Sequence, residues 1–164
     1  MAAVLAELTA GPDPVLLRPA REQDVPAIVD LLAADQLGAT RDGVRSGDDL
    51  AAYLGAFRAI DRDPAHLLLV ADADGAVVAT MQLSFLPGLA RRGAWRAQIE
   101  AVRVHADYRG RGLGEAMFRW AIAEARRRGC ALVQLTTDKS RGAAHRFYER
   151  LGFVPSHEGM KLSF

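Results

Sequence analysis

Glycine and arginine residues are concentrated in one short segment of the chain. Residues 109–114 have the sequence R-G-R-G-L-G and lie between a strand-like segment, 96–106, and a segment with helical periodicity, 112–128. The backbone N–H groups in the first turn of such a helix lack partners and lie at the positive end of the helix dipole. Glycine lets a ligand approach this backbone closely, and the arginines add positive charge. The pattern favours a site for a pyrophosphate-sized anion over a plain strand-to-helix turn.

Two familiar phosphate-binding loops do not match this segment. The P-loop pattern G-x-x-x-x-G-K-[ST] does not occur in the sequence. The dinucleotide pattern G-x-G-x-x-G, started at Gly110, requires a third glycine where the chain has Glu115. The segment therefore indicates a different phosphate-bearing ligand.

This loop and a second block of residues together resemble the GNAT superfamily of N-acetyltransferases. Arg109, Gly112 and Gly114 fill the fixed positions of the family's acyl-CoA-binding signature, [QR]-x-x-G-x-[GA]. Residues 144–153 are similar to its A-x-x-F-Y-x-x-x-G-F element. The resemblance extends over about residues 15–164. It implies an α/β fold with a mixed, mostly antiparallel sheet that is flanked by helices, in which two central strands splay apart to admit the pantetheine arm of acetyl-CoA.

The resemblance also implies which residues contact the co-substrate. Main-chain groups of Val102 and Val104 would meet the pantetheine arm. The phosphates would be held by Arg109, Gly110, Arg111, Gly112, Leu113 and Gly114. Arg141 stands where the family often has an asparagine near the arm, and at this position it could approach a phosphate.

Tyr148 occupies the position at which the family commonly has a general acid near the sulfur. A phenol has an ordinary pKa near 10, so it stays protonated at neutral pH and can donate a proton to a departing thiolate. The alternative is a core aromatic residue beside Phe147.

Glu100, in the strand before the loop, resembles the acidic residue that several family members use as a base. The period of two places it on one face with Val102 and Val104. A carboxylate among apolar strand residues is costly unless it is paired or used. The alternative is a carboxylate paired with an arginine such as Arg103.

The elements that must position these residues form one domain, 15–164, after a short leader, 1–14. An apolar alternation predicts strands, and a 3.6-residue period predicts helices. The expected strands are 15–20, 66–72, 76–86, 96–106, 131–137 and 157–164, and the expected helices are 22–35, 48–60, 112–128 and 140–153. This order includes at least one β-α-β crossover.

Composition excludes several classes of protein. The 164 residues are 50% hydrophobic and 25% charged, which is typical of a globular domain. The net charge of +1 argues against a nucleic-acid partner. No apolar run approaches the ~20 residues of a membrane-spanning helix, and the start of the chain lacks the basic region of a signal peptide, so we expect a cytoplasmic protein without a membrane partner. The single cysteine, Cys130, is expected to be structural, and we expect no metal because no cluster has metal-ligand spacing.

These features predict an acetyl-CoA-dependent N-acetyltransferase that transfers the acetyl group directly to an amine of a small molecule or peptide in a ternary complex. Ser156, His157 and Glu158 are candidates for contact with this acceptor, whose identity stays open. The rival interpretations are an acyl-CoA-sensing domain without catalysis and a nucleic-acid-binding domain that uses the arginines. Family members are often dimers, so a homodimer is one assembly to expect.

Overall fold

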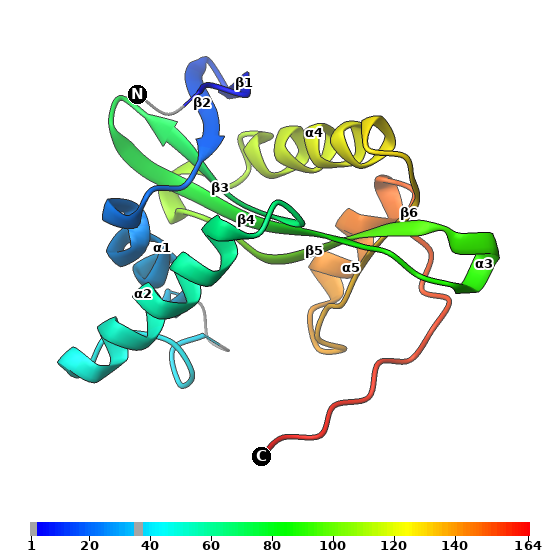
Figure 1. Ribbon diagram of the computed structural model, residues 1–164. Helices are drawn as coiled ribbons and strands as arrows, with labels where there is room; N and C mark the ends of the chain where they lie inside the picture. The colour runs from blue at the N-terminus through cyan, green and yellow to red at the C-terminus, as the bar shows by residue number, and fades with distance from the viewer. Residues whose placement is uncertain (1–2, 35–37) are drawn as a thin grey trace.

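The computed structural model describes residues 3–34 and 38–164. Six strands form one curled sheet in the order of the sequence (Figure 1). They are β1 (Ala6–Ala10), β2 (Asp13–Pro19), β3 (His66–Ala73), β4 (Ala76–Leu86), β5 (Trp95–Val104) and β6 (Cys130–Leu135). Neighbouring strands are antiparallel except β5 and β6, which are parallel and joined through a helix. The mixed, mostly antiparallel sheet with flanking helices confirms the predicted fold class and crossover.

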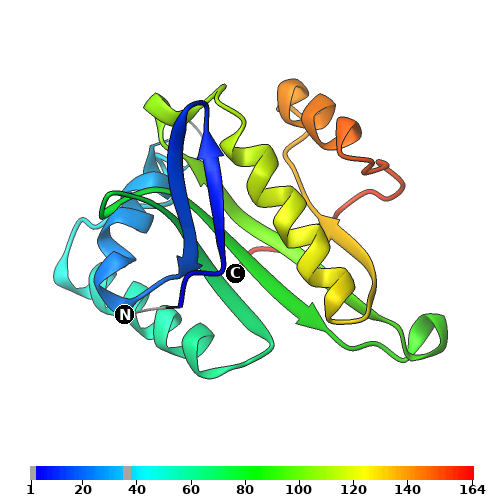
Figure 2. The same ribbon diagram turned by 90° about the horizontal axis from the view of Figure 1, so that it is seen from above.

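The N-terminal segment contributes a strand that the sequence did not predict. Residues 6–10, which belong to the expected leader, form β1 and pair with β2. Gly11 has φ +64° in the connecting turn, and its N–H donates to the carbonyl oxygen of Arg111 at 2.8 Å. Figure 2 shows the hairpin beside the helix that follows Gly112. The strand was hard to recognise because it has only five residues and two of its three apolar positions are alanine, a residue that is uncommon in strands. The boundary of the domain itself stays a prediction.

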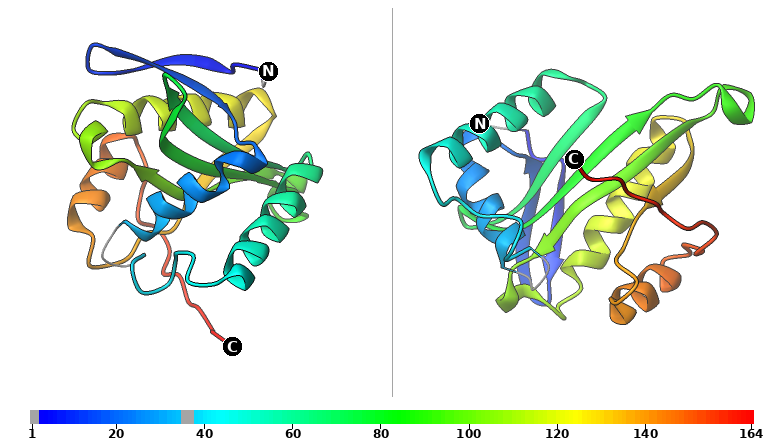
Figure 3. Two further views of the ribbon diagram at one scale, coloured as in Figure 1. Left: turned by 90° about the vertical axis from the view of Figure 1, so that its left-hand side faces the viewer. Right: turned by 90° about the horizontal axis from the view of Figure 1, so that it is seen from below.

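The helices cover both faces of the sheet. They are η1 (Glu22–Asp24), α1 (Val25–Ala33), α2 (Gly47–Arg62), α3 (Ala90–Gly93), η2 (Ala106–Tyr108), α4 (Leu113–Arg127) and α5 (Gly142–Arg150). Helix α4 lies on one face and α1 and α2 lie on the other, while α5 lies near β6 (Figures 1 and 3). In the parts of the chain that the structure describes, no helix is both long and apolar enough to cross a membrane.

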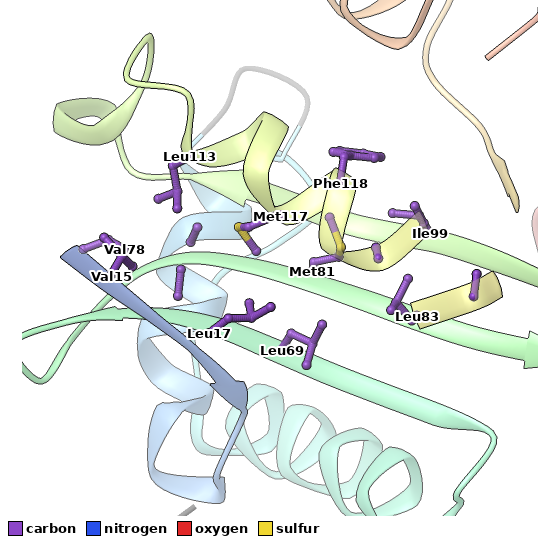
Figure 4. Close-up of a cluster of buried hydrophobic side chains, with 14 of the residues drawn as sticks. Val15, Leu17, Leu69, Val78, Met81, Leu83, Ile99, Leu113, Met117 and Phe118 are labelled. Atoms are coloured by element: carbon purple, nitrogen blue, oxygen red, sulfur yellow. The ribbon is translucent and has the colours of Figure 1, made fainter. Parts of the chain in front are cut away.

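The core lies mainly between the sheet and α4. Figure 4 shows Leu69, Met81 and Leu83 of the sheet close to Met117 and Phe118 of α4, and all five are almost completely buried. A second buried cluster lies on the other face of the sheet, toward α1 and α2. Alternate strand residues face it, and Val70 packs there with residues of α1 and with Phe57 of α2. The two periods of strand and helix therefore fix which face of each element is apolar.

The predicted final strand, 157–164, is wrong. These residues follow α5 without regular secondary structure, and their large apolar side chains are exposed. The alternation of polar and apolar residues is that of a strand, but a strand also requires a neighbouring edge with which to pair.

Candidate active site

The strands β5 and β6 diverge in the middle of the domain. Their parallel pairing extends from Trp95 and Cys130 to Ile99 and Leu135. Strand β5 then continues to Val104 while β6 ends, so the sheet opens beside residues 100–104. Backbone groups of β5 on this side face an opening that can accept an extended ligand as if it were a strand. This is the splay that the resemblance implies.

A β-bulge at Ala101 changes which side chains of β5 share a face. Ala101 has φ +53°, and the register with β4 shifts so that Glu100 pairs with Gln82 while Arg103 pairs with Thr80. A bulge adds one residue and reverses the alternation that follows it. The expectation that Glu100 shares a face with Val102 and Val104 is therefore wrong.

The two valines instead pack against the core beneath α4. Glu100 is exposed and shares the opposite face, on the side of α1 and α2, with Arg103. The sequence does not indicate this bulge, because the residue with positive φ is an alanine and not a glycine.

The start of α4 fits a pyrophosphate. Gly110 and Gly112 have φ +72° and +82°, a region that disfavours other residues, and an added Cβ at either would have no heavy atom within 4 Å. Gly112 is the N-cap, and its carbonyl accepts the N–H of Ala116 at 3.0 Å. The N–H groups of residues 113–115 precede this bond and have no side-chain cap. The open backbone at the positive end of a helix is suited to an anion.

The two arginines of the loop already make contacts within the protein. The Nε of Arg109 donates to the carbonyl oxygen of Val104 at 2.9 Å. Arg111 forms an ion pair with Asp13 at 2.8 Å, and its guanidinium lies 5.4 Å from the centre of the Tyr108 ring. Both residues are exposed, and each guanidinium has five N–H donors of which these contacts use only some.

A cleft of about 330 Å³ lies between α4 and α5. Its lining begins at Glu115, in the first turn of α4, and includes Arg119 and Arg150. Arg119 is also paired with Glu115 at 2.6 Å. The cleft therefore lies beside the open helix start and is lined by two cationic side chains.

Tyr148 projects from α5 into a cluster of aromatic rings. Its ring centre lies 5.4 Å from those of Phe118 and Phe147 and 6.0 Å from that of Phe153. Burial raises the pKa of Tyr148 above its ordinary value of 10.0, and the charges of Arg141 and Arg103 partly oppose this effect. The phenol is half-buried, so it is packed against the core and is also protonated at neutral pH.

Arginines from three segments lie near Tyr148 or near the loop before α5. Arg141 is the N-cap of α5, and both it and Arg103 of β5 lie within electrostatic range of Tyr148. Hydrogen bonds from Ser140 hold the pKa of Asp138 below its ordinary value, and the charges of Arg141 and Arg41 lower it further. The loop between α1 and α2 therefore comes close to the loop between β6 and α5.

The sequence suggested Arg103 only as a partner for Glu100. The approach of Arg103 to Tyr148 and of Arg41 to Asp138 depends on segments far apart in the chain. The sequence carries no signal for this proximity.

His105, the Ser156–Glu158 segment and Cys130 make local contacts or are partly buried. His105 caps η2 by accepting the N–H of Asp107 at 3.3 Å. His157 contacts the Ser156 hydroxyl at 2.8 Å, and Glu158 pairs with Lys139 at 3.3 Å, all of them exposed. Burial raises the pKa of the Cys130 thiol, which suits a structural residue and not a nucleophile. Within residues 3–34 and 38–164, no group of three or more potential ligands is placed to hold a metal ion.

Known proteins share this architecture. The family model described as the acetyltransferase (GNAT) family matches residues 28–153. Aminoalkylphosphonate N-acetyltransferase of Salmonella typhimurium is 34% identical over 109 residues, which are 66% of this chain and 70% of that protein. Glucosamine 6-phosphate N-acetyltransferase 1 of Oryza sativa is 37% identical over 102 residues, 60% of this chain and 59% of that protein.

A solved structure has the same fold over almost the whole chain. The crystal structure of a transcriptional regulator from Bacillus halodurans has a TM-score of 0.87 and 45% identity, and covers 92% of this chain and 99% of that one. The matched region contains the diverging strands, the glycine loop and Tyr148. The chain belongs to the GNAT family of acetyltransferases and is an enzyme of the acyltransferase class.

Proposed function

We propose that the chain transfers the acetyl group of acetyl-CoA directly to the primary amine of a small molecule that also carries a phosphoryl-type anion. The observation that carries this proposal is the opening between β5 and β6, which has the uncapped start of α4 on one side and Tyr148 on the other. Phe118 of α4 packs against the Tyr148 ring. Phe118 lies five positions after Leu113, the first residue of α4, so about 7.5 Å along the helix axis separates the two.

The family uses acetyl-CoA, which supplies an acyl group activated as a thioester. In the proposed complex the N–H groups of residues 113–115 and the glycine backbone bind the pyrophosphate. Backbone groups of Val102 and Val104 orient the pantetheine arm along β5. The carbonyl oxygens of both valines already accept bonds from Arg103 and Arg109, at 2.8 and 2.9 Å, so each would offer a second lone pair or its N–H group. Arg119 and Arg150 line the cleft available to the remaining part of the molecule.

Tyr148 and Glu100 divide the proton transfers. Glu100 takes a proton from the acceptor ammonium, directly or through water, and the free amine attacks the thioester carbon. As the new C–N bond forms and the C–S bond breaks, Tyr148 donates its phenolic proton to the leaving sulfur. Glu100 passes this first proton to solvent and then takes the second proton of the nitrogen as the amide forms. After product release that proton returns through solvent to Tyr148, so both groups recover their starting states and one proton is released overall.

The arginines favour an anionic acceptor. Arg41, Arg103 and Arg141 approach the acceptor side from three elements, whereas Glu100 offers a carboxylate for the amine. Arginine binds phosphoryl groups well because its planar fork can donate two hydrogen bonds. The names of the relatives from Salmonella and rice each state an acceptor with an amine and a phosphoryl-type group. The same chemistry suits this arrangement.

The test compares acceptors in pairs. Purified enzyme with acetyl-CoA is supplied with an aminoalkylphosphonate or the matching alkylamine, and with glucosamine 6-phosphate or glucosamine, while released thiol is measured. We expect a higher kcat/KM for the anionic member of at least one pair, by on the order of 10- to 100-fold for one charged hydrogen-bonded contact. Arg103→Met should lower the rate with the anionic acceptor more than the rate with the neutral amine, and so reduce this preference.

Equal rates within each pair would contradict the anionic acceptor and leave the acetyl transfer standing. Thermal stabilisation by acetyl-CoA without thiol release for any amine would instead favour an acyl-CoA sensor. Absence of stabilisation by acetyl-CoA would overturn the proposal as a whole.

A further inference from the structure

A row of four polar side chains crosses the sheet next to the opening between β5 and β6. The backbone pairs of this row join, from β3 through β4 and β5 to β6, the residues His66, Ser84, Gln98 and Gln134. The next pair along β5 and β6, Ile99 with Leu135, is the last one before the two strands diverge. The polar row therefore lies at the foot of the opening.

The row projects from the same face of the sheet as Glu100. Ala97 and Ile99 of β5 pack in the core beneath α4. Gln98 and Glu100 alternate with them and project from the opposite face, because the bulge comes only at Ala101. Two residues of extended strand separate Gln98 from Glu100 by about 7 Å. An acceptor whose amine reaches Glu100 therefore has atoms a few bonds from that amine over the polar row.

The four side chains form two hydrogen-bonded pairs that differ in what they leave open. The Ser84 hydroxyl is buried and lies 2.8 Å from the Nδ1 of His66, so these two groups satisfy each other. The Nε2 of Gln134 donates to the Oε1 of Gln98 at 2.9 Å. Both glutamines are half-buried, and the described part of the chain supplies no partner for the N–H₂ of Gln98 or the carbonyl oxygen of Gln134. Neither of these atoms is fully enclosed, so a ligand can reach both.

We propose that this Gln98–Gln134 amide pair binds hydroxyl groups of the acceptor, which places the substrate among hydroxylated amines such as amino sugars. The inference rests on the proposed acetyl transfer, because it assigns a subsite to the acceptor of that reaction. A hydroxyl both donates and accepts, so neighbouring hydroxyls can accept from the N–H₂ of Gln98 and donate to the carbonyl oxygen of Gln134. An alkyl chain at this place would remove water from both amides without replacing its hydrogen bonds, and it is therefore disfavoured.

The first experiment compares two amines with six-membered rings, glucosamine and cyclohexylamine, of which only glucosamine carries hydroxyls. Thiol release gives kcat/KM for each amine with the wild type, Gln98→Met, Gln134→Met and the double variant. The ratio of the two values cancels a loss of folded enzyme, and its change from wild type cancels the different basicities of the amines. We expect the ratio of glucosamine to cyclohexylamine to fall about tenfold in each single variant, because each removes one hydrogen-bonding partner.

Gln23→Met is the matched control for these variants. Gln23 is an exposed glutamine of η1, outside the sheet, and its replacement should leave the ratio at the wild-type value. A wild-type ratio in the double variant Gln98→Met, Gln134→Met would overturn the proposal.

The second experiment measures binding without the reaction. ¹⁵N-labelled enzyme is saturated with CoA, which has no acetyl group to transfer, and is titrated with either amine. The side-chain amide signal of Gln98 is identified by its loss in Gln98→Met. We expect this signal to shift with glucosamine and to stay in place with cyclohexylamine, whereas equal shifts, or none with glucosamine, would overturn the proposal.

The two experiments also separate this inference from the proposed function. Absence of thiol release with every amine would contradict the acetyl transfer, and the titration would then decide by itself whether the amide pair binds hydroxyls. A ratio that depends on Gln98 and Gln134, together with equal rates for glucosamine and glucosamine 6-phosphate, would contradict the anionic acceptor and support the hydroxyl subsite.

Discussion

Removal of one oxygen atom tests the proposed role of Tyr148. In Tyr148→Phe the ring stays, and with it the contacts at 5.4 Å to Phe118 and Phe147. No hydrogen bond to the phenol oxygen is present among the described residues, so the loss of the hydroxyl leaves no buried partner unsatisfied. We expect the free energy of unfolding to change by less than about 0.5 kcal/mol.

The expected kinetic loss is much larger. A positioned general acid contributes about 10²- to 10⁴-fold to the rate. Arg103 and Arg141 stay close to the site of the missing hydroxyl and can still stabilise a departing thiolate by their charge, which places the loss nearer 10²-fold. That factor corresponds to about 2.7 kcal/mol in the activation barrier. It should be found in kcat, while the KM for acetyl-CoA changes by less than about twofold.

The pH profile separates an acid from a structural residue. Burial raises the pKa of Tyr148 above 10.0, so its protonated form persists through the neutral range and is lost only above pH 10. Wild-type kcat should therefore fall above pH 10 from this group, and Tyr148→Phe should lack that decline. Thiol release measured from pH 6 to 11 gives both profiles, with Tyr108→Phe as a matched control. Full turnover by Tyr148→Phe would refute the acid role.

Three further variants test the base, the loop and the fold. Glu100→Gln should lower kcat by about 10²-fold at neutral pH and recover as rising pH deprotonates the amine; a parallel loss at every pH would contradict a base. Gly112→Ala should lower the free energy of unfolding in urea by about 1 kcal/mol because the φ of Gly112 is +82°, and it should raise the KM for acetyl-CoA about tenfold. Gly75→Ala is the control, since Gly75 has φ +89° in the β3–β4 turn and its replacement should affect stability alone. Burial acts to raise the pKa of Asp24, but hydrogen bonds from Arg18 and from a backbone N–H outweigh it and hold the pKa below its ordinary value. The Arg18–Asp24 ion pair therefore stabilises the fold above about pH 4 and loses this contribution as pH falls through the lowered pKa of Asp24. Asp24→Asn should cost about 3 kcal/mol of unfolding free energy at pH 7 and progressively less in acid. An equal loss at pH 7 and pH 3 would contradict this assignment.

Local patterns predicted most of the elements correctly. The Asp74-Gly75 turn between β3 and β4, the cap of α2 at Ser46 and the apolar face of α4 all depend on residues close in sequence, so the sequence contains their full description. The glycine loop belongs to this class, because positive φ at Gly110 and Gly112 is a local requirement.

The sequence by itself determined the fold class, the glycine loop before α4 and the spacing between this loop and Tyr148. Only the tertiary structure decided the face of Glu100, the approach of Arg41 to Asp138 and of Arg103 to Tyr148, and the absence of regular structure in residues 157–164. The reason is that a bulge, a meeting of distant loops and the pairing of a strand depend on neighbours that are far apart in the chain. Helical and strand periodicity depends only on residues a few positions away.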